Sequence, residues 1–291
     1  MTGYGRQRRV GGGGLKDGGP GRLLVVGGGP AGVAAATAAA RQGYGVVLAE
    51  RNAHLGGQLS IAGRALAHRE LWGRWLAWAE AELKETAVEV RLRTLVTKDE
   101  CAVWDRIVVA TGARPSGAPP TLPGRCAVLG AWTAILRPAP LSGSVVVIDK
   151  DGEWSALDAA EVLATHGHAV YLVTERAAPG HRLRAREQAA YLARLEALSV
   201  LVLPRHQLVV QGQERRLVLR DLSVGSDRPV ADHVGAVVVA PGRIPNDALW
   251  SEISTHPCVT RVADAVEPGG LEDAIIEGTR ALKPAYRPSP C

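Results

Sequence analysis

A glycine-rich turn between an apolar strand and an alanine-rich helix constrains this chain more than any other feature. The segment 22–50 reads RLLVVGGGPAGVAAATAAARQGYGVVLAE, and Gly27, Gly29 and Gly32 stand in it at G-x-G-x-x-G spacing. The apolar run 23–26 predicts a buried parallel strand, and the helix after the glycines extends to about residue 42. Because a strand precedes the glycines and a helix follows them, the motif has the context that a nucleotide site requires.

Each glycine of this turn has its own physical reason. The first permits the tight turn, the second lets the backbone approach a pyrophosphate, and the third lets helix and strand pack closely. The helix N-terminus supplies oriented N–H groups and a positive partial charge for phosphates. Gly43 ends the helix, a second strand covers 46–48, and Glu50 at its end is placed to accept hydrogen bonds from an adenosine ribose. The pattern predicts a dinucleotide site.

Charge and apolar content exclude several other classes. The chain has 291 residues, room for about two domains, with 46% hydrophobic and 22% charged residues. Of its net charge of +5, the segment 1–21 supplies +3, so the rest lacks the basic excess expected of a nucleic-acid-binding protein. That segment is glycine-rich and predicts a flexible tail, without a secretory signal. No apolar run approaches the roughly 20 residues of a membrane span.

The cysteines indicate a reducing cytoplasm. Cys101, Cys126, Cys258 and Cys291 are scattered, with no C-x-x-C pair and no metal-ligand spacing. We therefore expect neither a redox-active disulfide nor an iron–sulfur cluster held by this chain. His166 and His168 form an H-x-H pair beside a glycine, which we interpret as a helix end rather than a metal site.

The remaining chain alternates strands and helices. A helix is predicted over 65–84, a half-buried strand over 88–92 and a second helix over 183–198. The run DRIVVATGARP (105–115) predicts a buried strand that ends in small residues, which suits a crevice crossed by a ligand. Short strands are expected near 199–203, 207–210 and 216–220, the last two as a hairpin, with another strand over 234–240 and a closing helix before 282.

A second strand–helix–strand unit follows the first in outline. Strands over 145–148 and 169–173 flank a helix over 155–165, so the topology is duplicated. Its turn, however, carries Asp149, Asp151 and Glu153, followed by Trp154, where the first turn has glycines. We expect the three carboxylates to face the place of a pyrophosphate and to repel it. The second unit then keeps the fold without ordinary NAD(P) binding, although a variant nucleotide mode remains open.

These motifs together resemble a known family. The runs VVGGGPAGVAAA, LAER, LGGQLS, VVATGARP, DKDGEWSALDAAEVLATHGHAVYLVTE, APGRIPNDALW and VADAVEP, in this order, are similar to the C-terminal half of the trimethylamine dehydrogenase and dienoyl-CoA reductase family. The resemblance covers about residues 22–283. It implies an α/β fold of the pyridine nucleotide–disulfide reductase type, with two Rossmann-like dinucleotide-binding domains, the second inserted into the first. We expect a tail over 1–21, an FAD-binding domain over 22–124 and 246–285, and an inserted NAD(P)-type domain over 125–245.

The resemblance also implies which residues hold the cofactor, FAD or an ADP in its place. We expect the site to comprise Gly27, Gly29, Pro30, Ala31, Gly32, Glu50, Arg51, Gly57, Gln58, Leu59, Ala110, Thr111, Gly112 and Asp264. The aspartate would lie near the ribityl chain. This sequence departs from the family at Ala263, where a glycine is usual, and at Gly269 and Gly270, which replace an expected arginine after Pro268. No residue is singled out as a general acid or base.

Three functions follow as expectations. The first is an FAD-binding electron-transfer subunit of a heteromeric oxidoreductase or demethylase. In the family, a TIM barrel carries FMN and a 4Fe-4S cluster; here we expect that barrel on a separate partner chain, with an electron-carrier protein as a further partner. The second is a self-sufficient FAD-dependent NAD(P)H oxidoreductase, against which Asp149 and Asp151 argue. The third is a non-catalytic subunit that holds ADP or FAD. Substrates of the complex would be N-methylated amines or enoyl-type compounds, and no nucleic acid or membrane partner is expected.

Overall fold

The chain divides into two compact α/β units. The computed structural model describes residues 20–117, 122, 126–138, 143–211, 216–230 and 234–282. Within them, the first unit comprises the described parts of 1–60, 74–114 and 244–291, and the second comprises those of 61–73 and 115–243. All but two residues of the predicted tail, and Cys291, lie outside the described residues.

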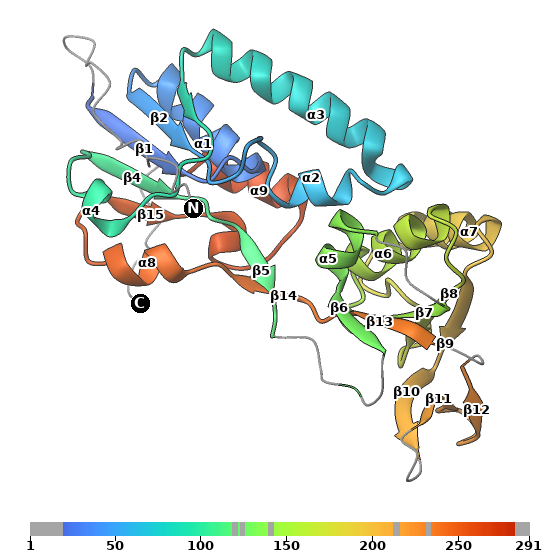
Figure 1. Cartoon of the computed structure of the whole chain (residues 1–291). Coiled ribbons are helices and arrows are strands. Elements are labelled where there is room, and N and C mark those ends of the chain that lie inside the picture. Colours follow the sequence, from blue (N-terminus) through green and yellow to red (C-terminus); the bar gives the residue numbers. More distant parts are fainter. Residues whose placement is uncertain are drawn as a thin grey trace, which may run out of the picture. The chain divides into compact units, whose positions relative to one another are not determined.

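The first unit is built on a parallel five-stranded sheet (Figure 1). In spatial order, the strands are β15 (Val259–Arg261), β4 (Arg106–Val109), β1 (Arg22–Val26), β2 (Gly45–Ala49) and β3 (Glu89–Arg91). The central strands are apolar on both faces because both are covered, as parallel sheets require.

Helices cover the two faces of this sheet. The unit contains α1 (Pro30–Arg41), α4 (Lys98–Cys101), α8 (Ala248–Ile253), the 3₁₀ helix η1 (Ala263–Ala265) and α9 (Leu271–Thr279). Leu24, Val47 and Ile107 point to the face where Cys101 of α4 and Ile253 of α8 pack. Helix α9 packs directly on α1, the helix that follows the glycine turn.

The second unit repeats the parallel architecture. In spatial order, its strands are β6 (Ala127–Gly130), β13 (Val234–Ala240), β7 (Ser144–Asp149), β8 (Val170–Thr174) and β9 (Leu201–Pro204). One face carries α5 (Ala131–Leu136), α6 (Trp154–Thr165) and α7 (Ala185–Ala197). The other face packs against a three-stranded sheet of β10 (His206–Gln211), β11 (Arg216–Asp221) and β12 (Asp227–Pro229).

The segment 61–73 belongs to the second unit, although its sequence neighbours belong to the first. It includes the end of α2 (Gln58–Ala62) and the beginning of α3 (Leu66–Glu85). Ala65, fully buried, lies in the same core cluster as α6 and α7. The strands β5 (Ala113–Pro115) and β14 (Arg243–Pro245), at the other two crossings of the chain, form a two-stranded sheet.

The fold class predicted from the sequence is confirmed, and the deviations are local. The helices expected over 65–84 and 183–198 are α3 and α7, and the predicted hairpin is the antiparallel pair β10–β11. The strand expected over 88–92 is shorter in the structure, where β3 covers Glu89–Arg91. Val90 is 36% exposed rather than half-buried, because β3 is the edge strand of its sheet. No helix in the described part of the chain is long and apolar enough to cross a membrane.

Candidate functional site

The turn after β1 is held closed by two of its glycines. Gly27 has φ +114°, and a Cβ on it would lie 2.3 Å from the Ala110 carbonyl oxygen. A Cβ on Gly32 would lie 1.8 Å from the Gly27 carbonyl oxygen. Both distances are shorter than any real contact, so any side chain would force the strands and α1 apart. These two glycines are required by the fold itself.

Gly29 is different, because nothing within the first unit requires a glycine there. Its φ of −77° is open to any residue. The nearest atom to a Cβ would be the Gly57 Cα, at 3.9 Å, which is an ordinary van der Waals distance. Gly29 is the second glycine of the motif, the position at which a bare backbone lets a pyrophosphate approach. The residues present therefore fit a dinucleotide.

The N-terminus of α1 is open to an anion. Gly29 is the N-cap residue and provides no side-chain cap, Pro30 is the first helical residue, and the first turn carries no acidic side chain. Ala31 and Gly32 are buried behind it. The positive end of the helix dipole is thus left for a ligand to neutralise.

Glu50 lies at the end of β2 and is 5% exposed. Its Oε2 accepts a 2.7 Å hydrogen bond from the Gly28 N–H, and its Oε1 accepts bonds from the backbone N–H and the side-chain amide of Asn52, at 2.8 and 2.7 Å. Oε2 accepts only one of these bonds and can accept a further one, so a ribose hydroxyl could still bind. Arg51 is exposed. The sequence pattern alone did not identify Gly28 and Asn52.

The loop after Glu50 returns to the turn. The Gly56 N–H donates a 2.8 Å hydrogen bond to the Gly28 carbonyl oxygen. Gly57 has φ +52°, and a Cβ on it would lie 3.3 Å from the Gly29 Cα. The predicted residues Gly29 and Gly57 are therefore neighbours, and Leu59 follows on α2, half-buried.

A second group of predicted residues meets around Gln58. Its side-chain amide donates a 2.8 Å hydrogen bond to Asp264 Oδ2, and a Cβ on Gly112 would lie 3.4 Å from its Nε2. Asp264 Oδ1 accepts a 2.8 Å bond from the Gly269 N–H. Thr111 is held by Asn246, whose carbonyl oxygen accepts its hydroxyl at 2.7 Å. Four segments distant in sequence thus converge in the first unit.

Two further residues support this site and were not predicted. Ala263, just before Asp264, has φ +53°, the left-handed conformation that favours glycine. Its N–H donates a 2.8 Å hydrogen bond to Glu277 Oε2, which helps to hold the conformation. On the same helix α9, Gly278 approaches α1 so closely that a Cβ would lie 2.2 Å from the Ala31 carbonyl oxygen. The only sequence signal for Gly278 is a glycine inside a helical pattern.

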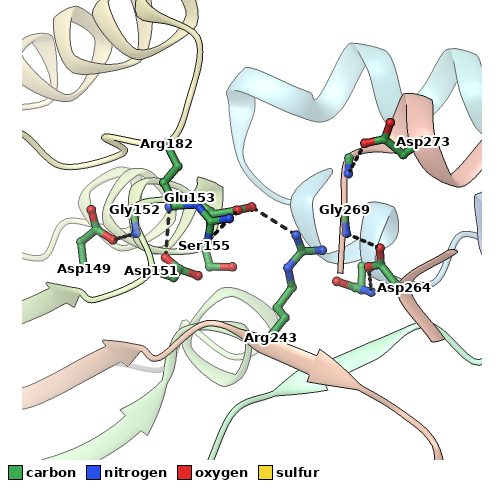
Figure 2. A network of polar contacts seen from close by, with 12 residues as sticks. Asp149, Asp151, Gly152, Glu153, Ser155, Arg182, Arg243, Asp264, Gly269 and Asp273 are labelled. Atoms are coloured by element: carbon green, nitrogen blue, oxygen red, sulfur yellow. Dashed lines mark hydrogen bonds and ion pairs between the residues drawn. The ribbon is translucent and has the colours of Figure 1, made fainter. Parts of the chain in front are cut away.

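The corresponding turn of the second unit, between β7 and α6, is built differently (Figure 2). Asp149 is 3% exposed, and its carboxylate accepts hydrogen bonds from the N–H groups of Gly152 and Gly180, at 2.7 and 2.8 Å. The expectation that all three carboxylates face the phosphate position is therefore wrong for Asp149. It points inward because two buried N–H groups need an acceptor.

The other two carboxylates stay at the turn. Asp151 Oδ1 accepts a 3.1 Å hydrogen bond from the Glu153 N–H. Burial raises the pKa of Asp151 to about 6. The charges of Asp149 and Glu153 also raise this pKa, whereas the hydrogen bond from the Glu153 N–H lowers it. Glu153 pairs with Arg243 at 3.1 Å and with Arg182 at 3.5 Å. The N–H groups that would bind a phosphate are thus taken by carboxylates.

The loop 180–182 closes the second turn further. The Arg182 N–H donates a 3.0 Å hydrogen bond to the Gly152 carbonyl oxygen, and a Cβ on Gly152 would lie 2.2 Å from the His181 ring. Trp154 is the first residue of α6, where the first unit has Pro30.

Among the residues that the structure describes, no group of three or more His, Cys, Asp or Glu side chains could hold a metal ion.

Comparison with known proteins identifies the family. Residues 21–260 match the family described as pyridine nucleotide-disulphide oxidoreductase, which is most of the chain. The chain belongs to this family. Membership in this oxidoreductase family supports FAD binding.

Individual relatives give further points of comparison. The chain is 29% identical over 232 residues to N,N-dimethylglycine/sarcosine dehydrogenase of Chromohalobacter salexigens, a match that covers 75% of this chain and 33% of that protein. It is 33% identical over 150 residues to the NADH oxidase of Thermoanaerobacter brockii, covering 49% of this chain and 22% of that protein. The chain thus matches a third or less of the length of these relatives.

A solved structure shows the same fold. The histamine dehydrogenase of Rhizobium sp. 4-9 superposes with a TM-score of 0.79 and 23% identity, covering 99% of this chain and 47% of that one.

Proposed function

We propose that this chain binds FAD in its first unit and transfers electrons as part of a flavoprotein oxidoreductase or demethylase. The observation that carries the proposal is Gly29. Neither its φ nor its packing requires a glycine, yet it stands at an uncapped helix N-terminus, where a Cβ would meet no atom closer than 3.9 Å. A pyrophosphate fits there, because it needs both a bare backbone and the positive end of a helix.

The chain's own residues divide the work of holding FAD. The turn 27–29 and the first residues of α1 would bind the pyrophosphate, and Glu50, already oriented by Gly28 and Asn52, would bind the ribose of the adenosine. Gln58 and Asp264 would bind farther along the cofactor. FAD itself would supply the electron-accepting and electron-donating chemistry. The task of the protein is then to bind and orient it.

We further propose that electrons reach this FAD from a partner rather than from a nicotinamide bound in the second unit. Asp149 and Asp151 use the N–H groups of the second turn, and Glu153 adds a carboxylate. An NAD(P)H pyrophosphate would meet these carboxylates in place of free N–H donors. The expected partner is a TIM barrel with FMN and a 4Fe-4S cluster on a separate chain. Its substrates would be N-methylated amines, as the N,N-dimethylglycine/sarcosine dehydrogenase relative suggests, or the enoyl-type compounds that the family resemblance implies.

The first test is an anaerobic visible spectrum of the purified chain before and after addition of NADH or NADPH. We expect a flavin band that nicotinamide leaves unchanged and that dithionite bleaches. A flavin that dithionite also leaves unreduced would favour a cofactor that only holds the structure together. Absence of any flavin band, even after reconstitution with FAD, would contradict the proposal.

A second candidate is a self-sufficient NAD(P)H oxidoreductase, and the match to an NADH oxidase favours it. Prompt bleaching by NADH or NADPH, with turnover of the isolated chain, would establish it in place of the main proposal.

The partner is tested separately. The tagged chain is co-purified from its native cells, and the co-purifying material is assayed for FMN and acid-labile sulfide. Chain that purifies alone, with full amine-oxidising activity, would contradict the partner.

A further inference from the structure

A buried group of ionisable side chains lies in the second unit, away from the second turn. Asp158 and Glu161 stand three residues apart on α6, so they lie on one face of the helix, and Tyr191 of α7 packs against them. The exposed fractions are 3%, 0% and 3%. The fourth member is His68, from the beginning of α3. We call these four residues the acid–histidine cluster.

The Tyr191 hydroxyl contacts both carboxylates. Its oxygen lies 2.7 Å from Asp158 Oδ1 and 3.1 Å from Glu161 Oε2. The hydroxyl has only one proton, so it can donate to only one of the two. The second contact becomes a hydrogen bond only if a carboxyl group carries a proton, and otherwise two electron-rich oxygens face each other. The cluster therefore has a place for one additional proton.

His68 is positioned to hold or share that proton. Its Nε2 lies 3.2 Å from Asp158 Oδ1, and its ring packs edge-on against Trp154 with 4.7 Å between centroids. The groups that face it are Asp158 and Glu161 from α6, and Tyr191 and Arg194 from α7. Arg194, whose side chain is 47% exposed, lies 3.4 Å from Glu161 Oε1. With His68 protonated, two cations balance two carboxylates; with His68 neutral, a buried negative charge is left over.

The same contacts fasten a chain segment. The Ala67 N–H, in the first turn of α3, donates a 3.1 Å hydrogen bond to Glu161 Oε2. Ala65 is fully buried in the core of the second unit. His68, Ala67 and Ala65 all belong to the segment 61–73, which the rest of the second unit holds although it is flanked in sequence by parts of the first.

We propose that the acid–histidine cluster is a proton-dependent latch, which holds the segment 61–73 on α6 and α7 when the cluster carries its additional proton and releases it as the pH rises. The geometry supplies the two states. With the additional proton on His68, its contact with Asp158 is an ion pair; with that proton on a carboxyl group, both Tyr191 contacts are hydrogen bonds. Without it, His68 carries no charge to offset the two carboxylates, and both buried carboxylates face one hydroxyl. Because α2 leads from Gln58 into this segment, release also frees the chain that follows the candidate cofactor site.

The direction of the proton affinities agrees with this arrangement. Burial lowers the pKa of His68, but the hydrogen bond and charge of Asp158 and the charge of Glu161 outweigh it, so that the pKa is raised above 6.5. Burial raises the pKa of Asp158 more than His68 and Tyr191 lower it. For both groups a raised folded-state pKa means that stabilisation is present below the unfolded-state pKa and is lost as pH rises through the folded-state pKa. The acid–histidine cluster therefore holds the segment 61–73 at the lower pH values.

The test uses the full chain and hydrogen exchange of the amides in 66–72, measured at pH 6.0 and 8.5 and divided by the exchange of an unstructured peptide of the same sequence. We expect the protection of the wild type to fall by about tenfold over this range, the change that one unit of pKa difference represents. The variant His68→Gln should show low protection at both values. His166→Gln is the matched control, since His166 is exposed at the end of α6 and outside the cluster.

A second measurement keeps the proposal falsifiable if His68→Gln folds poorly. The imidazole signals of His68 are titrated by NMR in the wild type and in Asp158→Asn. We expect a pKa above 6.5 in the wild type and a lower value in the variant, because Asp158→Asn removes the charge that raises the pKa of His68. A wild-type pKa at or below 6.5, or a protection of 66–72 that is the same at pH 6.0 and 8.5, would overturn the proposal.

Discussion

The backbone N–H of Gly28 donates a 2.7 Å hydrogen bond to Glu50 Oε2, although the two residues are 22 apart in the sequence. The bond joins the turn after β1 to the end of β2. The same carboxylate accepts two more hydrogen bonds from Asn52, so it is fixed in place. Glu50 therefore shapes the turn after β1, in addition to the ribose contact that we propose for it.

The dual role of Glu50 predicts that Glu50→Gln costs both stability and affinity. A glutamine amide would turn an N–H toward the buried N–H of Gly28 or toward the part-buried N–H groups of Asn52, and a buried donor left unsatisfied costs about 1–3 kcal/mol. We expect the free energy of unfolding in urea to fall by this amount and the Kd for FAD to rise at least about tenfold. Glu80→Gln, an exposed change on α3, is the control. Equal stability of the two variants would contradict the role of the Gly28 bond.

Gly29→Ala separates ligand binding from folding. A methyl group there meets no atom closer than 3.9 Å, so the fold should tolerate it. It would nevertheless occupy the space of the pyrophosphate, and we expect FAD affinity to fall about tenfold or more, which is about 1.4 kcal/mol. Titration with FAD and thermal unfolding without FAD measure the two effects. Gly73→Ala, in α3 with nothing within 4 Å, is the control and should gain about 0.5–1 kcal/mol of stability. An unchanged FAD affinity would remove Gly29 from the site.

Gly278→Ala tests the packing that supports the site from behind. Its methyl group would lie 2.2 Å from the Ala31 carbonyl oxygen, so α9 must move away from the first turn of α1. We expect a loss of about 1–3 kcal/mol in unfolding free energy, the usual cost of overpacking, together with weaker FAD binding. Gly73→Ala again serves as the control for the intrinsic effect of alanine in a helix. If Gly278→Ala were as stable as Gly73→Ala, the close approach of α1 and α9 would be refuted.

The raised pKa of Asp151 predicts that the stability of the folded chain depends on pH. Its folded-state pKa is raised to about 6, chiefly by burial, so ionisation costs stability as pH rises from about 4 through 6. Asp151→Asn removes this cost and keeps an oxygen for the Glu153 N–H. We expect the variant to equal the wild type at pH 4 and to exceed it at pH 7.5 by on the order of 1 kcal/mol. Urea unfolding at both pH values measures this, with the exposed Glu196→Gln as control. A variant without advantage at pH 7.5 would contradict the raised pKa.

The sequence by itself was sufficient for the fold class and for the first turn. Strand, glycine turn and helix are specified by neighbouring residues, because apolar periodicity and the conformational range of glycine act over a few positions. For the same reason the alternation of strands and helices predicted the second unit, and the position of Glu50 after β2 placed it beside the turn.

Tertiary structure decided which distant groups meet. Asp149 turns inward because Gly180, 31 residues later, brings an N–H that needs an acceptor. The segment 61–73 joins the second unit through contacts such as that of Ala67 with Glu161, 94 residues apart. Whether a carboxylate faces a ligand, a tyrosine or a backbone N–H depends on how helices dock, and docking is set by the summed packing of both partners. A local sequence pattern does not contain the packing of two distant elements, so these residue pairs are seen only in the folded chain.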